Sequence, residues 1–195
     1  MVYESVSSTP IDRSKPITIG EGMEYSNQYA SDFSNDYFRA DDVIGVKNLY
    51  ADGTMPAGYE RVGDYVKNIK TGEFVDGLTM DLGRKYWGVF GPKIGSNIYL
   101  SMSAFTSPEN LFLTMGHEYI HAAFNSIGYE ASNYTNKQEA VAYKWSYNQA
   151  SRWNMNSTSF YKMKMDFFAQ YNRGMYPWSL KTIREGFMKP YTKPW

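Results

Sequence analysis

The chain has 195 residues, a hydrophobic share of 43% and no cysteine, which is enough for one domain and excludes disulfides and thiolate metal sites. Its 20 basic residues balance 20 acidic ones without any basic tract, which argues against nucleic acid or an anionic membrane as a partner. No apolar run approaches the length of a membrane span.

The first part of the chain is polar and rich in Ser, Asp, Asn and Tyr. We predict that residues 1–40 form an irregular N-terminal extension and that residues 41–195 form the domain. A pro-segment that covers the functional site is one interpretation of this extension. The N-terminus has no apolar core typical of a signal peptide, so we expect a soluble protein or an excised module of a secreted or surface protein.

From residue 42 to 104 the pattern is typical of β-strands. Short runs with Val, Ile and Tyr are separated by Asp-Gly and Thr-Gly pairs, as in hairpins. The last of these runs predicts a strand over 97–104, in which Ile98, Leu100 and Met102 alternate with more polar residues.

After residue 105 the pattern becomes helical. Ser107 is a predicted N-cap, Pro108 suits the first helical position, and Glu109 suits the first turn. These signals predict a helix over about 108–125 that ends before the next glycine.

A second helix is predicted from 136 to about 153, since Thr135 and Gln138 have the spacing of a capping box. A third begins near the sequence STSF and extends to Asn172, and a short last helix follows the sequence PWSL. Strands come first and helices second, which predicts an α+β fold: a small antiparallel or mixed sheet followed by a helical half.

Both histidines of the chain lie in the sequence His-Glu-Tyr-Ile-His, at positions 117–121. Residues four apart on a helix share one face, so His117 and His121 can direct two imidazoles at one zinc ion. Glu118 lies about 100° further round the helix, where a general base for a metal-activated water belongs. The alternative interpretation is that two histidines pack in a core helix and bond to carbonyl oxygens.

A catalytic zinc ion usually has three protein ligands. No third histidine exists, so the third ligand is sought among the carboxylates that follow. Glu139 lies in the first turns of the next predicted helix, and Glu130 lies in the turn between the helices. We favour Glu139 because a helix holds a ligand better than a loop does, and Glu130 remains the alternative.

Tyr143 follows Glu139 by one helical turn. It is a candidate to hold the ligand carboxylate or to donate its hydroxyl to a developing oxyanion. The other interpretation is a buried tyrosine under the site. Asn125, two turns after His117, could orient a ligand.

With these motifs, residues 97–145 resemble the gluzincin group of zinc metallopeptidases. The resemblance rests on the strand NIYLSMS, the helix GHEYIHAAF and the stretch NKQEAVAYKW, about a quarter of the chain. It implies a zincin-like fold in which a second helix supplies a glutamate ligand, here Glu139. The run Glu-Ala-Val-Ala-Tyr is also similar to compact zincin-like domains at the C-terminal ends of bacterial polymorphic-toxin and repeat-associated proteins. Thermolysin-type motifs carry an aspartate where this chain has Tyr143.

The sequence therefore predicts a zinc metallopeptidase that hydrolyses peptide bonds with Glu118 as general base. We expect the substrate to pair with the predicted strand at 97–104. A first alternative is a catalytically silent zinc-binding or protein-interaction module of a larger bacterial surface or secreted protein. A second is a structural or adhesive domain in which the motif is a coincidence.

Overall fold

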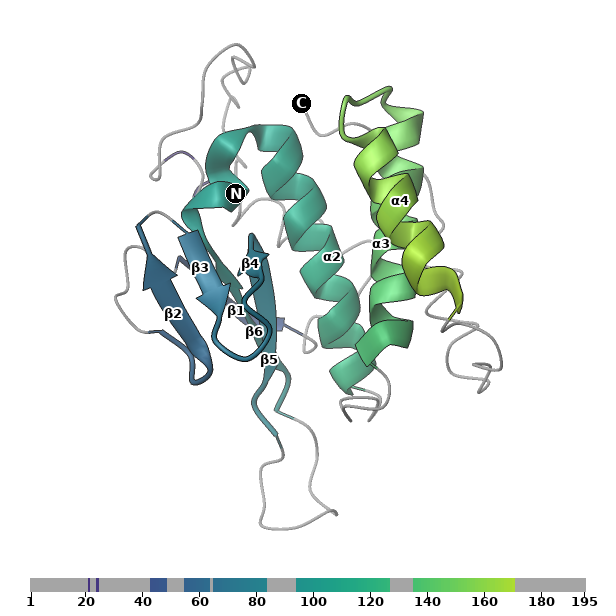
Figure 1. The fold of residues 1–195 in the computed structure, drawn as a ribbon. Coiled ribbons are helices and arrows are strands. Elements are labelled where there is room, and N and C mark those ends of the chain that lie inside the picture. Colours follow the sequence, from purple (N-terminus) through teal and green to yellow (C-terminus); the bar gives the residue numbers. More distant parts are fainter. Residues whose placement is uncertain are drawn as a thin grey trace, which may run out of the picture.

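The computed structural model describes Glu21, Glu24 and residues 43–48, 55–63, 65–83, 94–126 and 135–170. The strands are β1 (Val43–Asn48), β2 (Tyr59–Val62), β3 (Tyr65–Asn68), β4 (Phe74–Val75), β5 (Gly77–Asp81) and β6 (Ser96–Leu100). The helices are the 3-10 helix η1 (Met102–Thr106) and the α-helices α2 (Pro108–Ser126), α3 (Thr135–Arg152) and α4 (Thr158–Ala169). All six strands precede these helices, so the predicted α+β class is confirmed (Figure 1).

The sheet nearest the helices, sheet A, is mixed. Its strand order is β1-β6-β5, with β6 parallel to β1 and antiparallel to β5. The predicted strand over 97–104 is wrong in two respects. It ends at Leu100, and it lies in the middle of the sheet, so both of its edges are already paired.

The strand ends early because polar side chains after it bind nearby backbone groups. The amide of Asn110 donates to the backbone oxygen of Ser103 at 2.9 Å, and the hydroxyl of Ser107 accepts from the backbone N–H of Asn110 at 3.0 Å. Such bonds between side chains and nearby backbone compete with the ladder of an extended strand. Residues 102–106 therefore turn into η1, which leads directly to α2.

The second sheet, sheet B, has the order β2-β3-β4 and is antiparallel. It covers the face of sheet A that points away from the helices, where Val66 of β3 and Leu78 of β5 are buried together. Tyr59 and Tyr99 pack against this pair. Strand β4 continues into β5 through a single residue, Asp76, so one extended segment belongs to both sheets.

The main core lies between sheet A and the helices. Ile98 and Leu100 of β6 are fully buried against α2. Helix α2 has buried residues on all sides, because β5 and β6 contact one side and α3 the other. The arrangement is layered, with sheet B, sheet A, α2 and then the pair α3 and α4 in succession (Figure 1).

The predicted start of α2 is confirmed, since the hydroxyl of Ser107 accepts a hydrogen bond from the backbone N–H of Asn110 at 3.0 Å. The helix ends at Ser126, one residue beyond the prediction. Helix α3 begins at Thr135, one residue early. Helix α4 ends at Ala169, and the predicted extension to Asn172 lies outside the described residues, as does the predicted last helix.

Among the described helices, none is both long enough and apolar enough to cross a membrane, as the sequence predicted. Apart from Glu21 and Glu24, the predicted N-terminal extension lies outside the described residues.

Candidate metal centre

The two histidines of the chain lie one turn apart on α2, and Glu139 lies in the first turns of α3. The two helices approach closely beside them because Gly116 has no side chain. A Cβ atom at this position would lie 2.0 Å from Cη2 of Trp145, which is 2% exposed and packs on the glycine. The contact fixes α3 against α2 next to His117.

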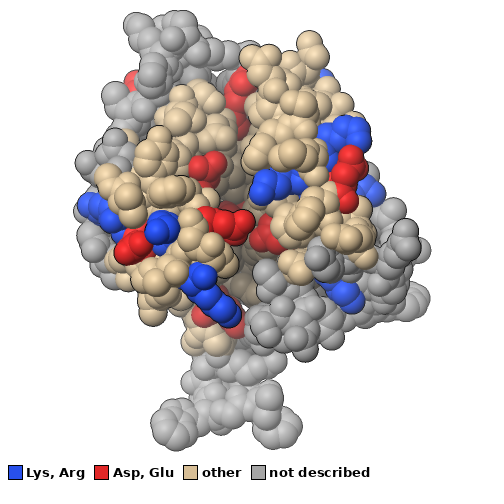
Figure 2. All heavy atoms as spheres, in the orientation of Figure 1, with Lys and Arg blue, Asp and Glu red and all other residues tan. Residues whose placement is uncertain are grey.

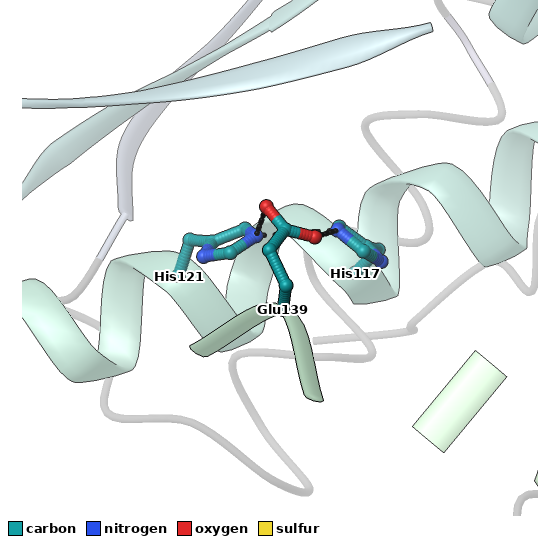
Figure 3. A group of neighbouring side chains, drawn as sticks. All are labelled: His117, His121 and Glu139. Carbon is teal, nitrogen blue, oxygen red and sulfur yellow. Dashed lines mark hydrogen bonds and ion pairs between the residues drawn. The ribbon is translucent and has the colours of Figure 1, made fainter. Parts of the chain in front are cut away.

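The three side chains converge. The Nε2 atom of His117 lies 3.2 Å from Oε2 of Glu139, and the Nε2 atom of His121 lies 3.3 Å from Oε1. The two Nε2 atoms are 3.2 Å apart. Figure 3 shows the carboxylate between the imidazoles, with one oxygen directed at each. One ligand atom from each residue lies within 4.8 Å of the others, so the group could hold a metal ion.

The sequence proposed this same set, with Glu139 favoured over Glu130. The structure brings Glu139 to the histidine pair, and Glu130 lies outside the described residues. The two helices run antiparallel because α3 follows α2 after a short connection. The spacing between His121 and Glu139 had predicted that Glu139 would lie opposite the histidine pair.

The charges of the group are strongly coupled in the absence of a metal. Burial alone would lower the pKa of His121, but the negative charge of Glu139 and a hydrogen bond to it raise that pKa to about 9. Burial alone would raise the pKa of Glu139, but the positive charge of His121 and hydrogen bonds from both histidines hold it well below its usual range. The metal-free centre is therefore an imidazolium–carboxylate pair.

Gln138 is a residue of the centre that sequence reasoning missed. Its Oε1 atom lies 2.9 Å from Nδ1 of His121, and its side chain is buried. An Nδ1–H bond to the amide oxygen leaves Nε2 directed at Glu139, where a ligand nitrogen is needed. The sequence assigned Gln138 to a capping box with Thr135, whose side chain lies outside the described set. The available signal was its position directly before the predicted ligand.

Glu118, the predicted base, is buried and faces β5. Its Oε2 atom lies 2.8 Å from the hydroxyl of Thr79, and its backbone oxygen lies 2.9 Å from the same hydroxyl. Its negative charge also helps to raise the pKa of His121, so the carboxylate lies within electrostatic reach of the centre. No local pattern of residues indicates that β5 contacts Glu118.

Tyr143 packs against the centre through its ring. The ring centroid lies 4.7 Å from that of His117 at an interplanar angle of 67°, and the ring also stacks on that of Phe168 with a centroid distance of 5.5 Å. None of the described residues forms a hydrogen bond with its hydroxyl, so the predicted bond to the ligand carboxylate is not formed. Burial, and then the negative charge of Glu139, raise the pKa of Tyr143, so its hydroxyl stays protonated.

The predicted role of Asn125 as a ligand-orienting residue is wrong. Its amide donates to the hydroxyl of Ser96 at 3.3 Å, and both residues are buried. The bond ties the end of α2 to β6, and Asn125 has a structural role.

A groove separates the strand half from the helical half, and acidic side chains gather along it (Figure 2).

Tyr59 of β2 is a second residue near the site that no sequence motif indicated. Burial raises the pKa of Tyr59, and the negative charge of Glu118 raises it further, so Tyr59 lies within electrostatic reach of Glu118. Its position depends on how the two sheets pack, which no local pattern encodes.

No protein-family model, curated protein or solved structure matches the chain.

Proposed function

We propose that the protein is a zinc-dependent metallopeptidase that hydrolyses peptide bonds. The single observation that carries the proposal is the convergence of His117, His121 and Glu139 within 4.8 Å, with Glu118 beside them. Two imidazoles and one carboxylate are a donor set that suits zinc, and three protein ligands leave a position open for water or substrate.

Zinc held by these residues would supply Lewis acidity and would acidify a water molecule. Glu118 accepts the proton from that water and passes it to the leaving amine. Its burial beside β5 excludes bulk water from the carboxylate, which strengthens its interaction with a nearby charge. The hydroxyl of Tyr143, kept protonated by its raised pKa, is the candidate donor to the developing oxyanion.

The substrate has to pair with a strand other than β6, whose edges are occupied. Strand β5 is the terminal strand of sheet A among the described residues, and it contacts α2 directly. The backbone groups of Asp76 and Leu82 form hydrogen bonds on the side of β5 that faces β6. Since these directions alternate along a strand, the backbone N–H and C=O groups of Gly77, Thr79 and Asp81 point away from β6. An extended peptide can form hydrogen bonds with this outer edge next to Glu118.

Metal analysis and a peptide-cleavage assay test the proposal together. Protein purified without chelator is expected to carry one equivalent of zinc and to cleave members of a broad peptide library. The variant Glu118→Gln should retain the zinc and lose cleavage by a factor of about 100 or more, since general-base catalysis contributes at least that much.

Glu60→Gln is the matched control. Glu60 is exposed on β2 and pairs with Lys67 at 3.6 Å, a surface ion pair that contributes little to stability. The control is expected to behave as the wild type. Equal cleavage by the wild type and the Glu118→Gln variant would remove Glu118 from the mechanism.

A catalytically silent zinc-binding module is the second candidate function. The observation that favours it is the absence of a third histidine, which leaves Tyr143 as the proposed oxyanion donor without a second imidazole to assist it. Zinc at one equivalent without cleavage of any peptide in the library would support this candidate over the peptidase.

A further inference from the structure

Strand β5 lies against Glu118 more closely than a side chain at Gly77 would allow. A Cβ atom at Gly77 would lie 2.9 Å from Cγ of Glu118 and 2.8 Å from Cγ2 of Thr114, and real Cβ contacts are longer. Gly77 and Thr79 are two positions apart on one strand, so both face α2. The glycine therefore brings the backbone of β5 within reach of Glu118, and the threonine follows it on the same face.

The hydroxyl of Thr79 contacts Glu118 at two points. Its Oγ1 atom lies 2.9 Å from the backbone oxygen of Glu118 and 2.8 Å from Oε2 of the carboxylate. The hydroxyl of Thr79 thus lies between the backbone oxygen and the carboxylate of Glu118. This arrangement fits only a narrow range of torsion angles of the Glu118 side chain. Glu118 is 6% exposed, so little water competes for the carboxylate.

The torsion of Thr79 itself is restricted. A β-branched side chain in a strand has few χ1 rotamers, and Thr79 is flanked on sheet A by Ile98 in the adjacent register position. The hydroxyl is therefore directed at Glu118 before any substrate or metal arrives. The strand supplies a fixed support, whereas Glu118 itself has three rotatable side-chain torsions.

We propose that Thr79 is a positioning residue that holds the carboxylate of Glu118 in the orientation needed to accept the water proton. The proposal rests on the proposed peptidase function. It also extends the functional unit from the two helices to β5, since the ligands come from α2 and α3 and the support for the base comes from the sheet.

The test compares two variants of the full-length, zinc-loaded protein. Thr79→Val removes the hydroxyl and keeps the shape, and Thr79→Ser keeps the hydroxyl. We expect Thr79→Val to lower kcat by about tenfold to a hundredfold, a part of the contribution of general-base catalysis, with KM and zinc content unchanged. Thr79→Ser should restore most of kcat. Thr114→Val is the matched control, because Thr114 is buried beside Gly77 but has no hydrogen bond to Glu118 among the described residues.

Crystal structures of the same zinc-loaded proteins give a measurement that does not depend on activity. We expect one orientation of the Glu118 carboxylate in the wild type and in Thr79→Ser, and a changed or divided orientation in Thr79→Val. If valine is not accommodated, Thr79→Ala replaces it in both measurements.

The outcomes separate the two proposals. A wild type that binds zinc but cleaves nothing overturns the peptidase, and the crystal structures still decide whether Thr79 orients Glu118. An active wild type with an equally active Thr79→Val variant and an unmoved Glu118 overturns the role of Thr79 alone.

Discussion

Loading the metal-free protein with Zn²⁺ is expected to release one proton from His121 at neutral pH. The pKa of His121 is raised to about 9 by the adjacent Glu139, so this imidazole is almost fully protonated at pH 7. A metal ligand must be deprotonated, so the ion has to displace that proton. Two pH units below the pKa, the apparent affinity is reduced about 100-fold, or about 2.7 kcal/mol. Raising the pH therefore strengthens binding, by about tenfold per unit, until it passes about 9.

Isothermal titration calorimetry in buffers with different ionisation enthalpies counts the protons released. We expect a value that is close to one at pH 7 and falls toward one half near pH 9. The chain has two histidines, so a proton NMR titration of the metal-free protein resolves few imidazole signals and gives the pKa directly. The variant Glu139→Gln removes the negative charge, and the pKa of His121 should fall in it. An affinity that stays constant between pH 6.5 and 8.5 would refute the coupling of His121 with Glu139.

Three further predictions concern single substitutions. Gly116→Ala places a methyl group on the ring of Trp145 and should lower the free energy of unfolding by about 1–3 kcal/mol in urea denaturation. Gly45→Ala, with its nearest atom at 3.5 Å, should have little effect. Tyr143→Phe should leave zinc affinity unchanged and lower kcat about 100-fold, and an unchanged kcat would reduce Tyr143 to packing. Gln138→Leu removes the Nδ1 partner of a ligand histidine and should weaken zinc binding about tenfold to a hundredfold in a chelator competition, and unchanged affinity would contradict that role.

The helices could be predicted because their signals are local. Ser107 and Pro108 set the start of α2, and the spacing of His117 and His121 placed both on one face. Glu139 could be identified as the third candidate ligand because few carboxylates come after the histidines. A helical hairpin also brings the second helix back along the first. All of these residues lie within one stretch of the sequence, from Ser107 to Glu139.

The partners of the site residues could not be predicted, because they depend on tertiary packing. Thr79 meets Glu118 across 39 positions of the chain, through the packing of β5 on α2. The central place of β6 depends on its pairing with β1, which lies about fifty residues earlier in the chain. The alternation of apolar residues identified β6 as a strand but not its neighbours, so the prediction that a substrate pairs with this strand was wrong.

The parallel pairing of β1 with β6 also bears on the order of folding. The contacts among α2, α3 and α4 join segments that follow one another, whereas β1 and β6 are separated by the whole of sheet B and β5. Pairing distant segments requires closure of a long loop, which slows folding. We expect the hairpin of α2 and α3 to form before sheet A is complete, and pulse-labelled hydrogen exchange can follow this order. A newly made chain would then bring His117, His121 and Glu139 together while Glu118 still lacks the support of Thr79.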